Sequence, residues 1–252
     1  MNKLSKGNRE YENWNGSRWE FTKRRSQWHF DPMKPAEPGK DSYTYVCRFD
    51  ADFTDAIKQC LPRTMESTWA TRNNFSKLPT EPKKRMYSAN EEEADLIRAG
   101  ADPHMKIFNR AAAEDIEIFQ KVSNYIGMDD CYIKFHNQTT GQMLVEHIDN
   151  FAGRQERANS FKVTRMDKHP EVVRRFAIML DDWKLGQIFQ LGNATWTQWR
   201  AGDCITWEWQ DIPHATCNMG WEDRPMLQLT GYVTEQTNRV LSQAGADQIV
   251  KL

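Results

Sequence analysis

The stretch Tyr132-Ile-Lys-Phe-His-Asn137 and the stretch Gln142-Met-Leu-Val-Glu-His-Ile-Asp149 carry the pattern that decides the fold of this chain. Both are short runs of apolar residues alternating with polar ones, which is typical of β-strands. Gly141 interrupts the pattern between them, as a turn residue does. We therefore expect two short strands. His147 and Asp149 should leave the same face of the second one because they are two residues apart.

Six more short runs of β type follow toward the C-terminus, broken by Gly, Asp and Pro. They cover 175–181, 186–191, 195–199, 204–209, 214–218 and 225–233. Eight short strands within about a hundred residues, with no helix between most of them, predict an antiparallel sandwich or jelly roll. The long connection within this region is the charged segment 150–170.

The region before residue 130 has a different pattern. Residues 43–50 alternate like a strand, 55–61 fit a short helix, and 61–90 fit an irregular loop. A stronger helix is predicted at about 104–126, because apolar residues recur there at helical spacing. The main members of this apolar stripe are Ile107, Ala111, Ile118, Val122 and Ile126.

Together these patterns predict one globular domain of the α+β class, with a mainly β core and supporting N-terminal helices. Its segments are a polar and aromatic arm (1–43), a mixed helical support region (44–130) with a helix capped at Asn90, the β core (131–234) and a C-terminal helix (235–252).

Two basic segments lie outside the expected strands. In the arm, Trp14, Trp19 and Trp28 surround Lys23-Arg24-Arg25, a combination that can stack bases and neutralise phosphates. Nearby acidic residues dilute this charge, which favours an arm that packs its tryptophans on the main body. The connection 150–170 fits a lid over an anionic or peptide substrate. Its basic residues include Arg154, Arg157, Lys162 and Arg165.

The composition limits the classes of partner. Lys+Arg 34 against Asp+Glu 35 gives a net charge of −1 over 252 residues. This balance does not support nucleic-acid or membrane binding, although it leaves room for a local basic patch. No apolar run reaches the length of about 18 residues that spans a bilayer. The five cysteines form no CxxC pair and no apolar leader is present, so we expect a reduced, cytoplasmic compartment.

His147, Asp149, His214 and Arg224 are the candidate functional residues. Two imidazoles and one carboxylate form the facial triad that suits non-haem Fe(II) and leaves coordination positions open. His214 begins a later predicted strand, and distant strands of a jelly roll meet across its interior. A guanidinium at Arg224 can hold the far carboxylate of 2-oxoglutarate by a bidentate pair.

From about 130 to 234 the chain resembles the double-stranded β-helix of the Fe(II)/2-oxoglutarate-dependent oxygenases, most closely the prolyl-hydroxylase-like branch. Gly141 stands six residues before His147, as in the branch pattern Tyr-x-x-Gly-x5-His-x-Asp. Arg200-Ala-Gly-Asp203 is similar to its Lys/Arg-x-Gly turn, and Trp209-Gln-Asp-Ile-Pro-His214 with Arg224 completes the order. The chain departs from the branch at Leu185-Gly186, which replaces Gly-Gly.

The resemblance implies an enzyme that uses Fe(II), 2-oxoglutarate and O2 to hydroxylate an unactivated C–H bond of a peptide or small molecule, with release of succinate and CO2. His147, Asp149 and His214 would be its catalytic and metal-binding residues. Arg224 would bind the cosubstrate, and a hydroxyl of Thr230 or Tyr132 would add a contact. Gln138 occupies the position where the branch has Tyr, which makes it a further candidate for cosubstrate binding.

Two other readings stay open at this point. One is a non-catalytic jelly-roll binding module whose triad holds a structural metal such as zinc. The other is a cupin-like iron dioxygenase that does not use 2-oxoglutarate. Three ligands without a fourth Cys or His nearby in the sequence favour a catalytic site over a structural one. The oligomeric state and the identity of the substrate are not indicated by the sequence.

Overall fold

The structure is a computed structural model that describes residues 31, 33–68, 105–147, 149, 173–209 and 212–252. The arm tryptophans, the helix expected at Asn90 and the basic lid expected at 150–170 lie outside these residues. No helix within the described ranges is both long and apolar enough to cross a membrane.

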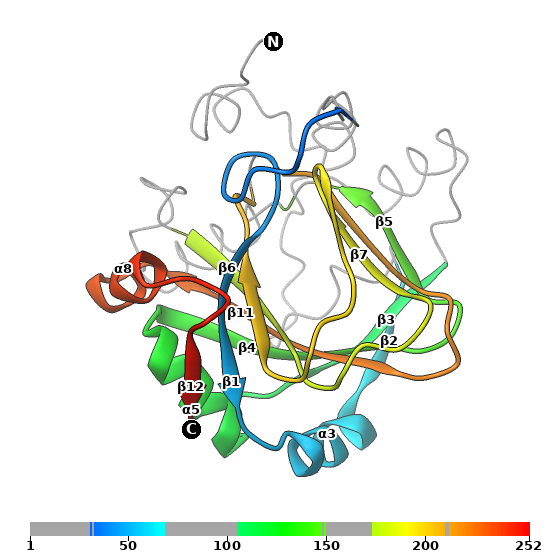
Figure 1. Ribbon diagram of the computed structural model, residues 1–252. Helices are drawn as coiled ribbons and strands as arrows, with labels where there is room; N and C mark the ends of the chain where they lie inside the picture. The colour runs from blue at the N-terminus through cyan, green and yellow to red at the C-terminus, as the bar shows by residue number, and fades with distance from the viewer. Residues whose placement is uncertain (1–30, 32, 69–104, 148, 150–172, 210–211) are drawn as a thin grey trace, which may run out of the picture.

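Two β-sheets pack face to face and form a jelly roll (Figure 1). The large sheet has eight strands in the order β12-β1-β9-β6-β11-β4-β3-β2, and the small sheet has the order β5-β10-β7-β8. The large sheet contains β1 (Thr44–Asp50), β2 (Met65–Thr68), β3 (Lys106–Ala112), β4 (Asp129–Gln138), β6 (Val173–Met179), β9 (Asp203–Thr206), β11 (Arg224–Tyr232) and β12 (Ile249–Lys251). The small sheet contains β5 (Met143–His147), β7 (Gln187–Leu191), β8 (Ala194–Trp196) and β10 (His214–Asn218).

The eight strands expected between 132 and 233 are confirmed as β4 to β11. The strand expected at 43–50 is β1, and the helix expected at 55–61 is α3 (Thr54–Cys60), followed by one turn of 3₁₀ helix (Leu61–Arg63). The antiparallel jelly roll and the short helix α3 therefore follow from the sequence pattern.

The prediction of a helix at about 104–126 is wrong for the first half of that range. Residues Lys106–Ala112 form β3, which pairs with β2 and β4, and the helix α5 is confined to Glu117–Ile126. Ile107 and Ala111 are four residues apart, a spacing that suits both the helical and the strand period. The tertiary pairing decides between them. It also makes residues 65–68 a strand rather than a loop.

The C-terminal helix is also shorter than expected. The helix α8 spans Glu235–Ser242 and begins with a capping box in which the Thr234 hydroxyl accepts from the backbone N–H of Thr237. Beyond it, Ile249–Lys251 form β12, which pairs in parallel with β1. The backbone N–H of Gly245 donates to the Val46 carbonyl and starts this return along β1.

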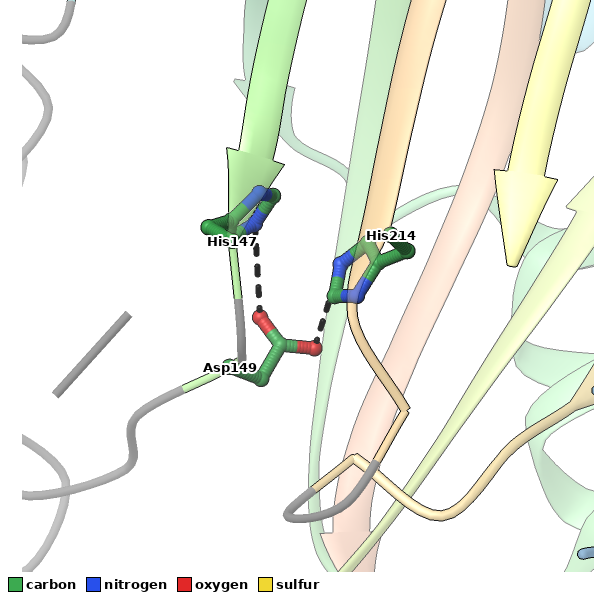
Figure 2. Close-up of side chains that lie close together, drawn as sticks. All are labelled: His147, Asp149 and His214. Atoms are coloured by element: carbon green, nitrogen blue, oxygen red, sulfur yellow. Dashed lines mark ion pairs between the residues drawn. The ribbon is translucent and has the colours of Figure 1, made fainter. Parts of the chain in front are cut away.

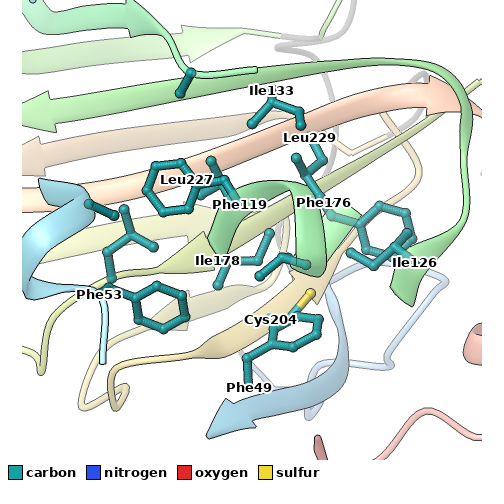
Figure 3. Close-up of a cluster of buried hydrophobic side chains, with 14 of the residues drawn as sticks. Phe49, Phe53, Phe119, Ile126, Ile133, Phe176, Ile178, Cys204, Leu227 and Leu229 are labelled. Carbon is teal, nitrogen blue, oxygen red and sulfur yellow. The ribbon is translucent and has the colours of Figure 1, made fainter. Parts of the chain in front are cut away.

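The outer face of the large sheet is covered by helices. Figure 3 shows the apolar side chains of this layer, with Phe119 and Ile126 of α5 against the strands that carry Phe176, Leu227 and Leu229. The same cluster includes buried residues of α3 and α8. Because side chains alternate along a strand, the neighbouring residues of β6 and β11 face the small sheet instead.

A second cluster fills the space between the two sheets. Met179 of β6 and Met226 of β11 meet Phe189 of β7 and Trp196 of β8 there. The two sheets therefore enclose a core of their own, and one end of that interior holds the candidate site.

Gly202 lies where the Lys/Arg-x-Gly turn was expected, between β8 and β9. Its φ of +87° belongs to the left-handed region, and its backbone N–H donates to the Met179 carbonyl at 2.7 Å. A Cβ at this position would overlap the carbonyl oxygen of Phe49 in β1. The turn thus needs glycine both for its backbone conformation and for the close approach of β1.

A series of three glycine variants separates these two requirements. Gly245→Ala should change the free energy of unfolding by less than about 0.5 kcal/mol, because an added Cβ there has no neighbour within 4 Å. Gly141→Ala has the same open space but a φ of +81°, so it should cost about 1–2 kcal/mol. Gly202→Ala should cost more than either, since β1 must also move. Urea unfolding measures all three, and equal losses at Gly141 and Gly202 would contradict this account.

Candidate metal centre

The pairing of β5 with β10 brings His147 and His214 together. The two residues are direct register partners, with His147 at the end of β5 and His214 at the start of β10. Their ring centroids are 4.2 Å apart. Two predicted ligands that are far apart in the sequence therefore lie side by side in the small sheet.

Asp149 completes the group, as Figure 2 shows. Its Oδ1 lies 3.9 Å from Nε2 of His147, and its Oδ2 lies 3.7 Å from Nε2 of His214. One donor atom from each of the three residues lies within 4.8 Å of the others, and all three side chains are buried. No further His, Cys, Asp or Glu joins this group within the described residues. Three clustered donors fit a metal that keeps open coordination positions.

Backbone carbonyl groups orient both imidazoles. The Nδ1 of His147 lies 2.9 Å from the Val145 carbonyl oxygen, and the Nδ1 of His214 lies 3.4 Å from that of Ile212. A carbonyl oxygen can only accept, so the ring hydrogen belongs on Nδ1 in each case. In the neutral ring, the form that binds a metal, the lone pair is then on Nε2, the atom that faces Asp149. This is the arrangement found for metal-binding histidines, whose second nitrogen donates to an acceptor.

Aromatic side chains line the site beside His214. The Trp207 ring lies 5.1 Å from the His214 ring, and Phe189 lies 5.7 Å from Trp207. Both are almost fully buried and belong to the cluster between the sheets. Trp207 and Trp209 both belong to this core, and the packing keeps water away from one side of the histidine.

Arg224 is a buried cation on the inner face of the large sheet. Its side chain is 4% exposed, and burial lowers its pKa to about 10, an effect that the nearby Cys217 opposes in part. Its Nη1 donates to the Ile188 carbonyl at 3.3 Å, and its Nε has no hydrogen-bond partner within the described residues. No carboxylate among those residues pairs with it. A buried charge of this kind is costly, which indicates a place for an anion.

Gln138 is the register partner of Arg224 across β4 and β11. Its amide nitrogen donates to the Ile107 carbonyl and to Thr216 Oγ1, both at 2.8 Å. These two bonds use both amide hydrogens. The oxygen Oε1, which has no partner in the described part of the chain, can accept but cannot donate to a carboxylate.

Thr230 and Tyr132 lie elsewhere on the same face. They are register partners of each other, and six residues along a strand separate Thr230 from Arg224, about 20 Å at about 3.4 Å per residue. The Thr230 hydroxyl accepts from Nε of Arg175 at 3.1 Å. The fold therefore brings His147, Asp149 and His214 together and sets Gln138 beside Arg224. It does not bring Thr230 or Tyr132 to Arg224.

Sequence reasoning missed Arg175. This residue of β6 pairs in register with Thr230, and its Nη1 forms an ion pair with Oδ1 of Asp149. A signal for it was present, since Arg175 shares a strand face with Val173, Ala177 and Met179, which are buried. A charged residue on the apolar face of a strand needs a partner.

Removal of one ligand tests the metal centre. His214→Ala should weaken Mn²⁺ binding by more than about 100-fold, because loss of an outer partner alone typically costs about 10–100-fold. Isothermal titration of the metal-free protein measures the affinity. As a control, Asp203→Asn alters a buried carboxylate outside the group, bonded to Tyr45 and the Arg200 backbone. Unchanged affinity in His214→Ala would refute the assignment.

Comparison with known proteins gives limited information. No family model and no curated protein matches the chain. Similar solved structures include a cupin 2 conserved barrel domain protein from Salinispora arenicola, at 10% identity and a TM-score of 0.30 over 54% of this chain and 84% of that one. A predicted oxalate decarboxylase from Thermotoga maritima is 11% identical, with a TM-score of 0.30 over 50% of this chain and 81% of that one. At these TM-scores the likeness carries no argument about function. The jelly roll is established by the chain's own strand order.

Proposed function

We propose that this protein is an Fe(II)- and 2-oxoglutarate-dependent oxygenase that hydroxylates an unactivated C–H bond of a peptide or small molecule. The observation that carries the proposal is the buried guanidinium of Arg224, which has no carboxylate partner among the described residues and lies in the same jelly roll as the His147, Asp149 and His214 group. A structural zinc site would explain the three ligands but would leave this cation without a role.

The residues present fit both groups. Two neutral imidazoles and a carboxylate are donors suited to Fe(II), and three donors leave room for two oxygens of an oxo acid and for O2. The guanidinium of Arg224 offers a planar pair of donors to a carboxylate, and a dicarboxylic oxo acid has a second carboxylate for it. The Oε1 of Gln138 accepts only, so Arg224 provides the donors at this end.

Each residue then has a definite task. When bound, Fe(II) and 2-oxoglutarate would activate O2 for oxidation of the substrate, with release of succinate and CO2. His147, His214 and Asp149 hold the metal, and the carbonyls of Val145 and Ile212 fix the two ring orientations. Arg224 sets the position of the oxo acid by binding its far end. Trp207 and Phe189 exclude water next to His214.

Anaerobic titration tests the proposal without knowledge of the substrate. Protein loaded with Fe(II) should develop a weak visible charge-transfer band when 2-oxoglutarate is added, and air should then produce succinate slowly. His214→Ala should show neither signal. A wild-type protein that binds Fe(II) but gives no band and no succinate would instead favour a structural metal or an iron dioxygenase without an oxo acid.

Arg224→Met should stabilise the ligand-free protein while it abolishes 2-oxoglutarate binding. The pKa of Arg224 in the folded protein lies below its ordinary value, so the positive charge opposes folding at every pH below about 10. Removing it should raise the free energy of unfolding at neutral pH by about 1–3 kcal/mol. Urea unfolding measures this gain.

The matched control is Arg200→Met, which changes an exposed arginine and should shift stability by less than about 0.5 kcal/mol. Thermal unfolding with 2-oxoglutarate and Mn²⁺ supplies the second measurement. The oxo acid should add stability to the wild type and to Arg200→Met but not to Arg224→Met. A loss of stability in Arg224→Met would show that its charge is compensated and would remove the main support for the proposal.

A further inference from the structure

Arg175 makes two directed contacts beside the metal centre. Its Nη1 pairs with Oδ1 of Asp149, and its Nε donates to Thr230 Oγ1 at 3.1 Å. The side chain of Asp149 is 2% exposed and that of Arg175 is 13% exposed. An ion pair at this depth is weakly screened by water, and its geometry is fixed at both ends of the guanidinium.

The fold holds this arginine rigidly. β6 lies inside the large sheet, between β9 and β11, and Arg175 faces Thr230 directly in the register of β6 with β11. Because a guanidinium is planar, the bond at Nε sets the plane in which Nη1 meets the carboxylate. Asp149, by contrast, follows the end of β5 and has no strand of its own. The position of its carboxylate therefore depends on side-chain contacts.

We propose that Arg175 is a positioning residue for the metal-binding carboxylate. By engaging Oδ1 it leaves Oδ2, the oxygen 3.7 Å from Nε2 of His214, as the one presented to the metal. Asp149 then binds through a single oxygen, with the second held by the protein, and Thr230 acts through Arg175. The inference rests on the metal centre of the proposed function but not on the oxo acid.

The direction in which metal affinity changes when Arg175 is removed distinguishes a positioning role from simple charge balance. A guanidinium that only neutralised Asp149 would compete with the metal cation for the same carboxylate, and its removal would tighten metal binding. A guanidinium that positions the carboxylate helps binding, and its removal weakens it, typically by about 10–100-fold for an outer partner of a metal ligand. The two roles thus predict opposite changes in affinity.

Mn²⁺ titration of four variants, without cosubstrate, tests the inference. Arg175→Met should weaken binding by about 10–100-fold. Thr230→Val keeps the shape and the arginine charge but removes the acceptor for Nε, and should weaken binding several-fold. Thr230→Ser restores the acceptor and should bind like the wild type. Arg174→Met, one residue earlier and paired with Glu208, is the control and should leave the affinity unchanged.

The visible spectrum of the Co²⁺-loaded protein gives a second readout. If Arg175 only stabilised the fold, its replacement would leave this spectrum unchanged. Freed from Arg175, both oxygens of Asp149 can reach the metal, so the ligand-field bands should shift in Arg175→Met and in Thr230→Val but not in Thr230→Ser. Unchanged or tighter Mn²⁺ binding in Arg175→Met would overturn this inference and leave the metal centre in place, and so would Co²⁺ spectra that are unchanged in both Arg175→Met and Thr230→Val. A wild-type protein that binds no Mn²⁺ would overturn the metal centre, and this inference with it.

Discussion

The alternation of side chains along β11 is the constraint on which the rest of the structure depends. Leu227 and Leu229 pack under the helices, and Met226 packs between the sheets. Arg224 and Thr230 share the face of Met226 because a strand repeats every two residues. A shift of pairing by one residue would press Arg224 into the helical layer and turn the leucines toward the metal centre. Core packing and site geometry are therefore set by one register.

Much of the fold could be predicted because its signals are local. Short runs of β type, separated by turn residues, mark each strand from β4 to β11 within its own segment of sequence. Where the prediction failed, the deciding interaction was distant. Residues 106–112 become a strand because β2 and β4 offer backbone partners on both sides. Residues 249–251 become a strand because β1 offers them backbone partners. Three residues are too few to show a strand pattern in the sequence.

The candidate site, like the fold, could be predicted only in part. His147, Asp149 and His214 could be recognised because residue type and order are visible in the sequence, and the cross-strand pairing then brings them together. The partner of Asp149 could not be identified, since Arg175 reaches it only through the placement of β6 beside β11. The apolar residues around Arg175 were a signal that this arginine needs a partner, but they do not identify the carboxylate with which it pairs.

β5 is one of the two edge strands of the small sheet, and His147 is its last residue. Ends of edge strands are where hydrogen bonds open at the lowest free energy. A metal shared by His147 and His214 would cross-link this strand end to β10, so metal binding would stabilise the pairing of β5 with β10. At the proposed metal centre, local opening of this strand end would then be enough to release the ion, without unfolding of the domain. The folded jelly roll would in that case exchange its metal without refolding.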